Sequence, residues 1–224
     1  MKNRTVNTLH VLVLALLVTP FYLNDFASIY IKDWHLWLFI DYVGVKFFPL
    51  MLIIWLILSK KMRMFEFGLI RQSVPSFLAS FLILVLIGTL IDQNGYAFLT
   101  KLPGYSPLGY MPTIDNPAWN WIDLMFGLLL VGVLEELVFR AYMYNFLIRF
   151  THDIPVIITF SALAFGLIHW SLGLHAVLIT SVIGAVFMFA YIRTRALPPL
   201  ILAHFVINFI DFSGVVPKSM FQWI

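Results

Sequence analysis

Seven runs of mainly apolar residues constrain this chain more than any other feature of its sequence. A helix that crosses the hydrocarbon core of a bilayer needs about 20 such residues, and it satisfies its own backbone hydrogen bonds inside the lipid. The fourth run is long for a single crossing, which predicts a tilt or an extension past the membrane surface. We therefore predict an all-α, polytopic membrane bundle of about seven transmembrane helices. The runs cover residues 8–23, 36–58, 76–91, 119–148, 155–172, 174–193 and 197–213.

The composition agrees with lipid as the solvent. Hydrophobic residues make up 62% of the 224 residues and charged residues 11%, whereas soluble domains are about half apolar and about a quarter charged. This excludes a water-soluble enzyme, a disordered chain and a conventional nucleic-acid-binding protein. We expect a single membrane domain over residues 1–224, because little sequence remains for a separate aqueous domain. The chain has no cysteine, which excludes a disulfide, a thiolate metal site and a cysteine nucleophile.

The basic residues predict the orientation. If the seven runs alternate in direction, one membrane face receives nine lysines and arginines and the other receives three. Loops rich in these residues stay in the cytoplasm, so we predict a cytoplasmic N-terminus and an extracytoplasmic C-terminus. A Gly- and Pro-rich stretch over residues 92–117 then reads as an extracytoplasmic loop. The nine are Lys2, Arg4, Lys60, Lys61, Arg63, Arg71, Arg149, Arg193 and Arg195; the three are Lys32, Lys101 and Lys218.

Three ionisable residues lie inside the fourth apolar run: Glu135, Glu136 and Arg140. Each costs about 2.5 to 3.5 kcal/mol at the centre of a bilayer, so they are expected to face protein or water. Glu136 and Arg140 are four residues apart and share one helix face, while Glu135 points elsewhere. A charge pair that only pins two helices together needs one acid and one base. Glu135 is the additional acid, and without a cation in its own helix it suits a general base.

Two later runs carry polar residues at helical spacing. His169 follows Phe165 by four residues, and Asn208 follows His204 by four, with Asp211 continuing the same stripe. Each pair also has a purely structural explanation. His169 would be a packed or interfacial histidine, and His204 with Asn208 would form interhelical hydrogen bonds.

Other polar residues in the apolar runs give weaker signals. Asp41 and Lys46 are five residues apart and are not expected to share a helix face, so they mark a helix turned toward the bundle. Ser161 shares a face with Phe165 and His169, but no acid or base is in register with it. We therefore discount a serine nucleophile.

Taken together, the three motifs resemble the CPBP family of intramembrane proteases, which includes the CAAX prenyl proteases and the bacteriocin-processing or immunity (Abi) proteins. The motifs are EExxxR at residues 135–140, FxxxH at 165–169 and HxxxN at 204–208. The segments LEELVFRAYMYNFL, SALAFGLIHW and YIRTRALPPLILAHFVINF are similar to the three conserved blocks of that family. The resemblance covers residues 119–210 and predicts that the active site lies among the last four helices. Ala141 departs from the glycine that many members have, and residues 1–118 show no likeness.

The resemblance implies a role for four residues. In the family, the first glutamate of EExxxR activates a water as a general base, which gives that role to Glu135. His169 would share in proton handling with the water. His204 and Asn208 would stabilise the oxyanion of the tetrahedral intermediate.

The resemblance also implies which residues support the site and raises the question of whether the site holds a metal ion. Glu136 and Arg140 would hold the catalytic residues in place. Two histidines and a glutamate are also a zinc ligand set, and for a metalloprotease-like mechanism the ligands would be Glu135, His169 and His204. The same residues suffice for a glutamate-activated water, so no cofactor is required on the preferred interpretation and zinc is the alternative.

The implied function is an intramembrane endopeptidase. It would hydrolyse a peptide bond of a membrane-associated, lipidated or leader-type peptide, or of a membrane-anchored protein, with membrane lipid around it and no nucleic acid. We also predict a water-filled cavity open to the cytoplasm. The first alternative is a non-catalytic bacteriocin-immunity or scaffold protein of the same fold. A proton-coupled transporter is the second alternative, and the lack of inverted repeats opposes it.

Overall fold

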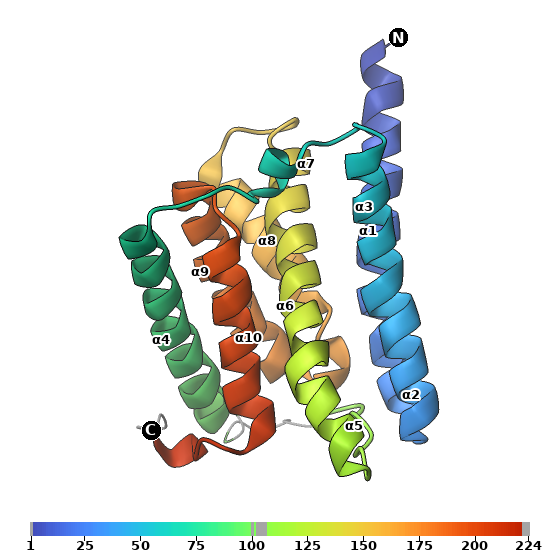
Figure 1. The fold of residues 1–224 in the computed structure, drawn as a ribbon, viewed down its shortest axis with the longest axis vertical. Helices are drawn as coiled ribbons and strands as arrows, with labels where there is room; N and C mark the ends of the chain where they lie inside the picture. The colour runs from blue at the N-terminus through green and yellow to red at the C-terminus, as the bar shows by residue number, and fades with distance from the viewer. Residues whose placement is uncertain (1, 100, 102–106, 221–224) are drawn as a thin grey trace.

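The computed structural model describes residues 2–99, 101 and 107–220, and every regular element among them is helical (Figure 1). The long elements run alternately up and down the bundle, as the seven apolar runs predict. The elements are α1 (Lys2–Tyr30), α2 (Trp34–Ile40), η1 (Asp41–Phe47), α3 (Phe48–Leu58), η2 (Met64–Phe67), α4 (Val74–Leu99), α5 (Pro117–Ile122), η3 (Asp123–Gly127), α6 (Leu128–Glu136), η4 (Leu137–Tyr142), α7 (Met143–Leu147), α8 (Ile154–Leu167), η5 (Trp170–Leu172), α9 (Leu174–Thr194), α10 (Pro198–Ser213) and η6 (Lys218–Met220).

The helices form two groups. The first group holds α1 and the continuous rod α2–η1–α3, which lie side by side at one edge of the molecule (Figure 1). In the second group α10 packs between α4 and α6, and α9 packs against both α4 and α8. The rod that contains α6 contacts η1 and so joins the two groups. The N-terminal end of α1 and α7 lie at one end of the bundle, and α5 and the C-terminal end of α10 lie at the other.

Four helical segments are long and apolar enough to cross a membrane: Thr8–Tyr30, Trp34–Leu58, Val74–Leu99 and Leu174–Thr194. Two shorter apolar helices, α8 and α10, accompany them. The remaining rod, from α5 to α7, carries Glu135, Glu136 and Arg140. These helices support a helical membrane bundle, while the exact number of crossings stays a prediction.

Three predicted boundaries are wrong. The first run, predicted to end at residue 23, continues as α1 to Tyr30. The loop predicted from residue 92 begins later, because α4 continues to Leu99. The polar residues at the start of that stretch make hydrogen bonds within the helix: Asn94 Nδ2 donates to the carbonyl of Leu90 at 2.9 Å, and Gln93 Nε2 donates to Asp92 at 2.6 Å. The fifth run, predicted to residue 172, ends as a helix at Leu167.

Three segments of the rods are π-helical: η1, η3 and η4. In η1 the amide of Phe48 donates to the carbonyl of Val43, five residues back. The wider turn brings residues five apart together, so Asp41 and Lys46 form a buried ion pair. The prediction that these two residues do not share a face is therefore wrong, since it assumed regular α-helical geometry.

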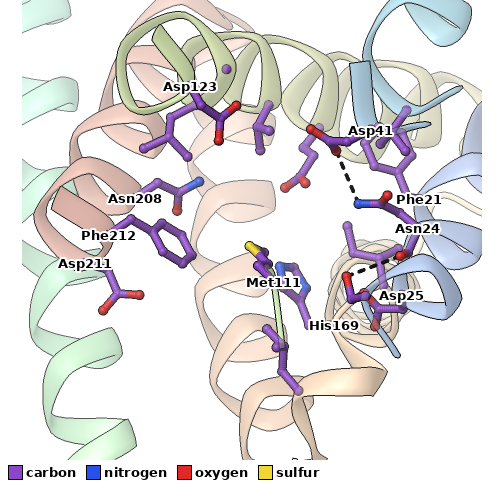
Figure 2. Close-up of a pocket in the computed structure, with 18 of the residues that line it drawn as sticks. Phe21, Asn24, Asp25, Asp41, Met111, Asp123, His169, Asn208, Asp211 and Phe212 are labelled. Atoms are coloured by element: carbon purple, nitrogen blue, oxygen red, sulfur yellow. Dashed lines mark hydrogen bonds between the residues drawn. The ribbon is translucent and has the colours of Figure 1, made fainter. Parts of the chain in front are cut away.

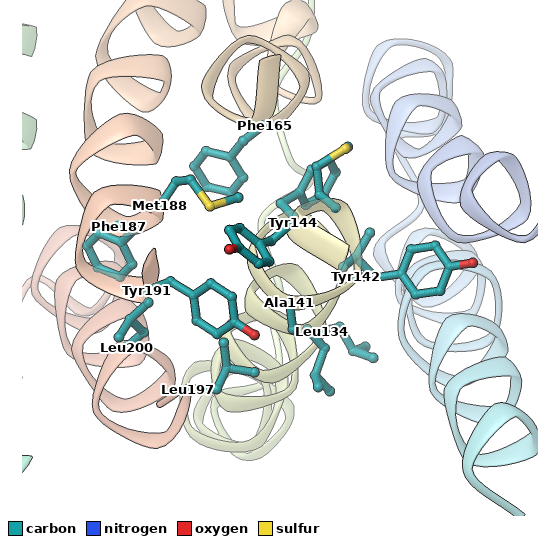
Figure 3. Close-up of a cluster of buried hydrophobic side chains, with 14 of the residues drawn as sticks. Leu134, Ala141, Tyr142, Tyr144, Phe165, Phe187, Met188, Tyr191, Leu197 and Leu200 are labelled. Atoms are coloured by element: carbon teal, nitrogen blue, oxygen red, sulfur yellow. The ribbon is translucent and has the colours of Figure 1, made fainter. Parts of the chain in front are cut away.

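The core lies between the rod α6–η4–α7 and helices α8, α9 and α10. It is made of large apolar and aromatic side chains, which Figure 3 shows converging from the different helices. Small residues allow α8 and α9 to approach closely, because Gly166 faces the Val177 carbonyl and Ser181, and Gly184 faces Ala162. In lipid, helices gain no hydrophobic free energy by associating, so close van der Waals packing of this kind stabilises their contact instead.

We expect Gly166→Ala to destabilise the bundle by about 1–3 kcal/mol, the typical cost of overpacking. A Cβ at this position would lie 2.6 Å from the backbone carbonyl oxygen of Val177, which a side-chain rotation cannot relieve. Gly44→Ala is the matched control, because a Cβ there meets nothing within 4 Å. Thermal unfolding in detergent measures both variants, and equal midpoints for them would contradict the predicted α8–α9 packing.

Candidate active site

The charged cluster begins with an ion pair within one rod. Arg140 Nε lies 3.2 Å from Glu136 Oε2, and both side chains are completely buried. Their spacing of four residues predicts this contact. The pair spans the junction of α6 and the π-helical segment η4. Burying either charge alone would be costly, so the two side chains fix one another.

His204 of α10 joins this pair to the second glutamate. Its Nδ1 lies 2.8 Å from Glu136 Oε1, and its Nε2 lies 3.5 Å from Glu135 Oε2. Because the carboxylate that is paired with Arg140 acts as an acceptor, Nδ1 carries a proton and donates it. The imidazole is thus held with Nε2 directed toward Glu135, an arrangement that orients a histidine through its other nitrogen.

Aromatic rings enclose the cluster. The guanidinium of Arg140 lies over Phe165, 4.3 Å from the ring centroid, and 5.7 Å from that of Phe187. The same two rings lie edge-on to His204, with centroids 5.9 and 6.1 Å apart. The sequence motif singled out Phe165 without a role. In the structure its ring also lies edge-on to His169, with centroids 5.4 Å apart, so Phe165 packs against both histidines.

His169 lies in the turn between α8 and α9. Its Nδ1 is 3.2 Å from the Phe165 carbonyl oxygen, which can only accept, so Nδ1 donates and Nε2 is left for the cavity. Helix α1 holds the turn in place: Asp25 Oδ2 accepts the Ser171 amide at 2.7 Å, and Trp170 Nε1 donates to the Tyr22 carbonyl at 3.3 Å. The first group of helices therefore positions a predicted site residue, although its sequence shows no family likeness.

A cavity of about 480 Å³ lies between the two groups of helices. Glu135, His169 and Asn208 line it, so the structure brings three of the four predicted catalytic residues to one space. The fourth, His204, does not line the cavity, but its Nε2 lies 3.5 Å from Glu135, which does. Figure 2 shows His169, from the turn after α8, and Asn208, from α10, facing this space. Asp211, one turn beyond Asn208, completes the polar stripe predicted on α10.

The cavity carries more charge than the sequence motifs predict. Asp41 and its partner Lys46 reach it from η1, and Asp123 reaches it from η3 and accepts a hydrogen bond from Tyr42 at 3.1 Å. For Asp41 and Asp123 the sequence signal is an acid within or beside an apolar run. In the described part of the chain, the lining contains one lysine, Lys46, and the carboxylates of Asp25, Asp41, Asp92, Asp123, Glu135 and Asp211.

The cavity lies toward the end of the bundle that holds α5 and the turn at His169. Its lining includes residues 111–114, Asn120 and Phe212, all from that end. For the predicted cytoplasmic N-terminus this would be the extracytoplasmic end, so the predicted orientation and the predicted opening to the cytoplasm do not agree with each other, and both stay predictions. His169 lies beyond α8, which ends at Leu167.

Ser161 has a structural role. Its hydroxyl is fully buried and donates to the Phe139 carbonyl at 2.7 Å. Phe139 lies in η4, where the π-helical turn disturbs the regular hydrogen-bond ladder. The serine thus links α8 to the rod that carries the glutamates, and it does not line the cavity.

The residues considered for zinc do not form a metal site in this structure. Within residues 2–99, 101 and 107–220, no three His, Asp or Glu side chains are grouped closely enough to hold a metal ion. The Nδ1 of His204 is also engaged by Glu136 and is not available to a metal. The set Glu135, His169 and His204 therefore does not fit a metal here.

Comparison with known proteins agrees with the motifs. Residues 117–210 match the model of the Rce1-like type II CAAX prenyl endopeptidase family. This segment runs from α5 to α10 and includes all six predicted site residues, so the resemblance predicted for residues 119–210 is confirmed. No curated protein and no solved structure matches the chain.

Proposed function

We propose that the protein is an endopeptidase that hydrolyses a peptide bond at or within the membrane, with a water activated by Glu135. The observation that carries this proposal is the chain of contacts from Arg140 through Glu136 and His204 to Glu135, at the wall of a 480 Å³ cavity. The family match supports a protease at the level of the family. The substrate would be a membrane-associated, lipidated or leader-type peptide, or a membrane-anchored protein.

The reaction needs a base, an oxyanion site and a proton donor. Glu135 accepts a proton from the water, and the hydroxide oxygen forms a bond to the carbonyl carbon of the substrate. His204 Nε2 and the Asn208 amide donate to the oxyanion. In this role the ring of His204 carries a proton on both nitrogens, and Glu136 balances its charge. Glu135 then returns its proton to the amine nitrogen as the C–N bond breaks, which leaves a new carboxyl group and a new amine.

His169 has a separate part in the proposal. With Nδ1 donating to the Phe165 carbonyl, its Nε2 is an acceptor at the cavity wall. It shares in handling the protons of the water and the substrate.

The orientation of the protein is also a proposal. The basic residues favour a multi-pass cell-membrane protein with the N-terminus in the cytoplasm and the C-terminus outside. With that orientation the cavity faces the extracytoplasmic side, and substrates would be cleaved there.

The experiment compares the termini of membrane proteins and peptides, by mass spectrometry, in cells with equal amounts of wild-type protein or Glu135→Gln. A protease predicts discrete fragments that disappear in the variant. A non-catalytic immunity or scaffold protein predicts identical profiles. Its phenotype would instead be altered by substitutions on the lipid-facing surface. Identical profiles would overturn the proposed activity.

We expect metal chelation to leave cleavage unchanged. EDTA and 1,10-phenanthroline, added to the purified protein before a substrate peptide mapped in the first experiment, should alter the rate by less than about twofold, because no step here uses a metal. Loss of activity that zinc restores would contradict the glutamate mechanism and favour the alternative with Glu135, His169 and His204 as ligands.

A further inference from the structure

A second, smaller cavity of about 50 Å³ lies beside the first. Its polar lining comes from Arg140, His169, His204, Asn208, Asp92 and Thr180. Four of these six also line the large cavity, namely Asp92, His169, Thr180 and Asn208, so they form the boundary between the two spaces. A water needs about 10–15 Å³ of such space and two to four polar partners. The small cavity provides both, next to the predicted catalytic histidines.

The polar groups around this space are arranged for water. Among the described residues, Nη1 and Nη2 of Arg140 are buried and have no hydrogen-bond partner. Buried donors are almost always satisfied. Acceptors in the small cavity would therefore take the hydrogen bonds that these two nitrogens of the guanidinium can donate. The Thr180 hydroxyl donates to the Ala176 carbonyl at 2.7 Å and presents its lone pairs as acceptors.

Asp92 is the acidic side chain at the boundary that the proposed reaction does not use. It lies in α4, outside the segment that matches the family, and it is 7% exposed. Its Oδ2 accepts from Gln93 Nε2 at 2.6 Å, and the same nitrogen lies 3.3 Å from Asp211 Oδ1. The neighbouring amide thus fixes the carboxylate of Asp92 at the wall that the two cavities share.

We propose that the reaction water lies at the boundary where the small cavity meets the large one, and that Asp92 is a positioning residue for it. The Asp92 carboxylate accepts a hydrogen bond from the water and so aims its lone pair toward the substrate carbonyl in the large cavity. Glu135, which lines the large cavity and not the small one, removes the other proton from the side of the large cavity. This inference rests on the proposed hydrolytic function, and it adds a residue that neither the motifs nor the family match includes.

Asp92→Asn tests the inference, because asparagine keeps the shape and the bond to Gln93 but replaces a carboxylate oxygen with a donor. Asp211→Asn is the comparator: it changes the second carboxylate beside the same Gln93, at the wall of the large cavity only. The readout is the rate at which wild-type-specific fragments form after induction in cells. A peptide that spans a mapped cleavage site then gives kcat and KM. Thr180→Val is a second variant of the small cavity.

We expect Asp92→Asn to lower kcat by about tenfold or more with KM within about twofold, as misplacement of a reacting group does. Asp211→Asn should affect kcat at least about fivefold less, and Thr180→Val should lower kcat about threefold. Equal losses of kcat in Asp92→Asn and Asp211→Asn would show a structural effect through Gln93 and overturn the inference. If Asp92→Asn does not fold, a Thr180→Val rate equal to that of the wild type overturns it.

The failure of the proposed function is a different result. In that case the wild-type protein itself produces no fragment that Glu135→Gln lacks. An active wild type, an inactive Glu135→Gln and a fully active Asp92→Asn would instead reject the water-positioning role alone.

Discussion

Glu135→Gln lowers the rate of peptide cleavage by about 10²–10⁴-fold, the contribution of a general base, while the bundle still folds. Glutamine keeps the size of the side chain and cannot accept the proton of the water. The effect on folding is small, because Glu135 Oε2 makes no hydrogen bond among the described residues and lies 3.5 Å from His204 Nε2. Initial rates with a mapped peptide, together with the unfolding midpoint, measure both effects.

Glu66→Gln is the matched control. Glu66 lies in η2, outside the cavity lining, where its Oε2 accepts the Arg63 amide at 2.6 Å. This exchange should leave the cleavage rate within about twofold. If Glu135→Gln and Glu66→Gln have similar rates, Glu135 is not the base.

Arg140→Met lowers the free energy of unfolding by about 3–5 kcal/mol, the cost of removing one partner of a buried ion pair. The variant leaves Glu136 charged at a completely buried position, with only His204 beside it. It also removes the guanidinium from the faces of Phe165 and Phe187. Unfolding in mixed micelles at graded denaturant measures the loss.

The double variant Glu136→Gln with Arg140→Met separates charge from packing. It removes both charges, so we expect it to recover about half or more of the lost stability, because an apolar pair of similar volume is often neutral. Cleavage should stay low, since His204 Nδ1 then faces a neutral amide and loses the carboxylate that orients it. A double variant as unstable as Arg140→Met would contradict the ion-pair explanation.

The sequence predicted the parts of the molecule that follow regular geometry. The apolar runs 36–58, 119–148, 174–193 and 197–213 agree with helical rods of the structure to within two residues. The spacing of Glu136 and Arg140 predicted their contact because α-helical residues four apart share a face. The three motifs predicted that helices distant in sequence meet, and the contacts of His204 with both glutamates agree with that expectation.

The remainder depends on local departures from regular geometry and on tertiary contacts. The ion pair of Asp41 and Lys46 requires the π-helical turn of η1. No pattern in the sequence predicted that turn. Asp92 was assigned to a loop because it begins the Gly- and Pro-rich stretch 92–117, whereas α4 continues through it to Leu99. Asp25 holds the His169 turn from α1, a contact across 146 residues of sequence that periodicity cannot detect.

Hydrolysis in water enriched in ¹⁸O tests the central claim most directly. The purified protein is incubated with a peptide that spans a mapped cleavage site, and both products are weighed by mass spectrometry. We predict that the new carboxyl terminus carries one ¹⁸O atom from the solvent, and that Glu135→Gln makes at most about one hundredth as much of this product. Labelled product formed equally well by Glu135→Gln, or no cleavage by the wild type, would contradict a Glu135-activated water in this cavity.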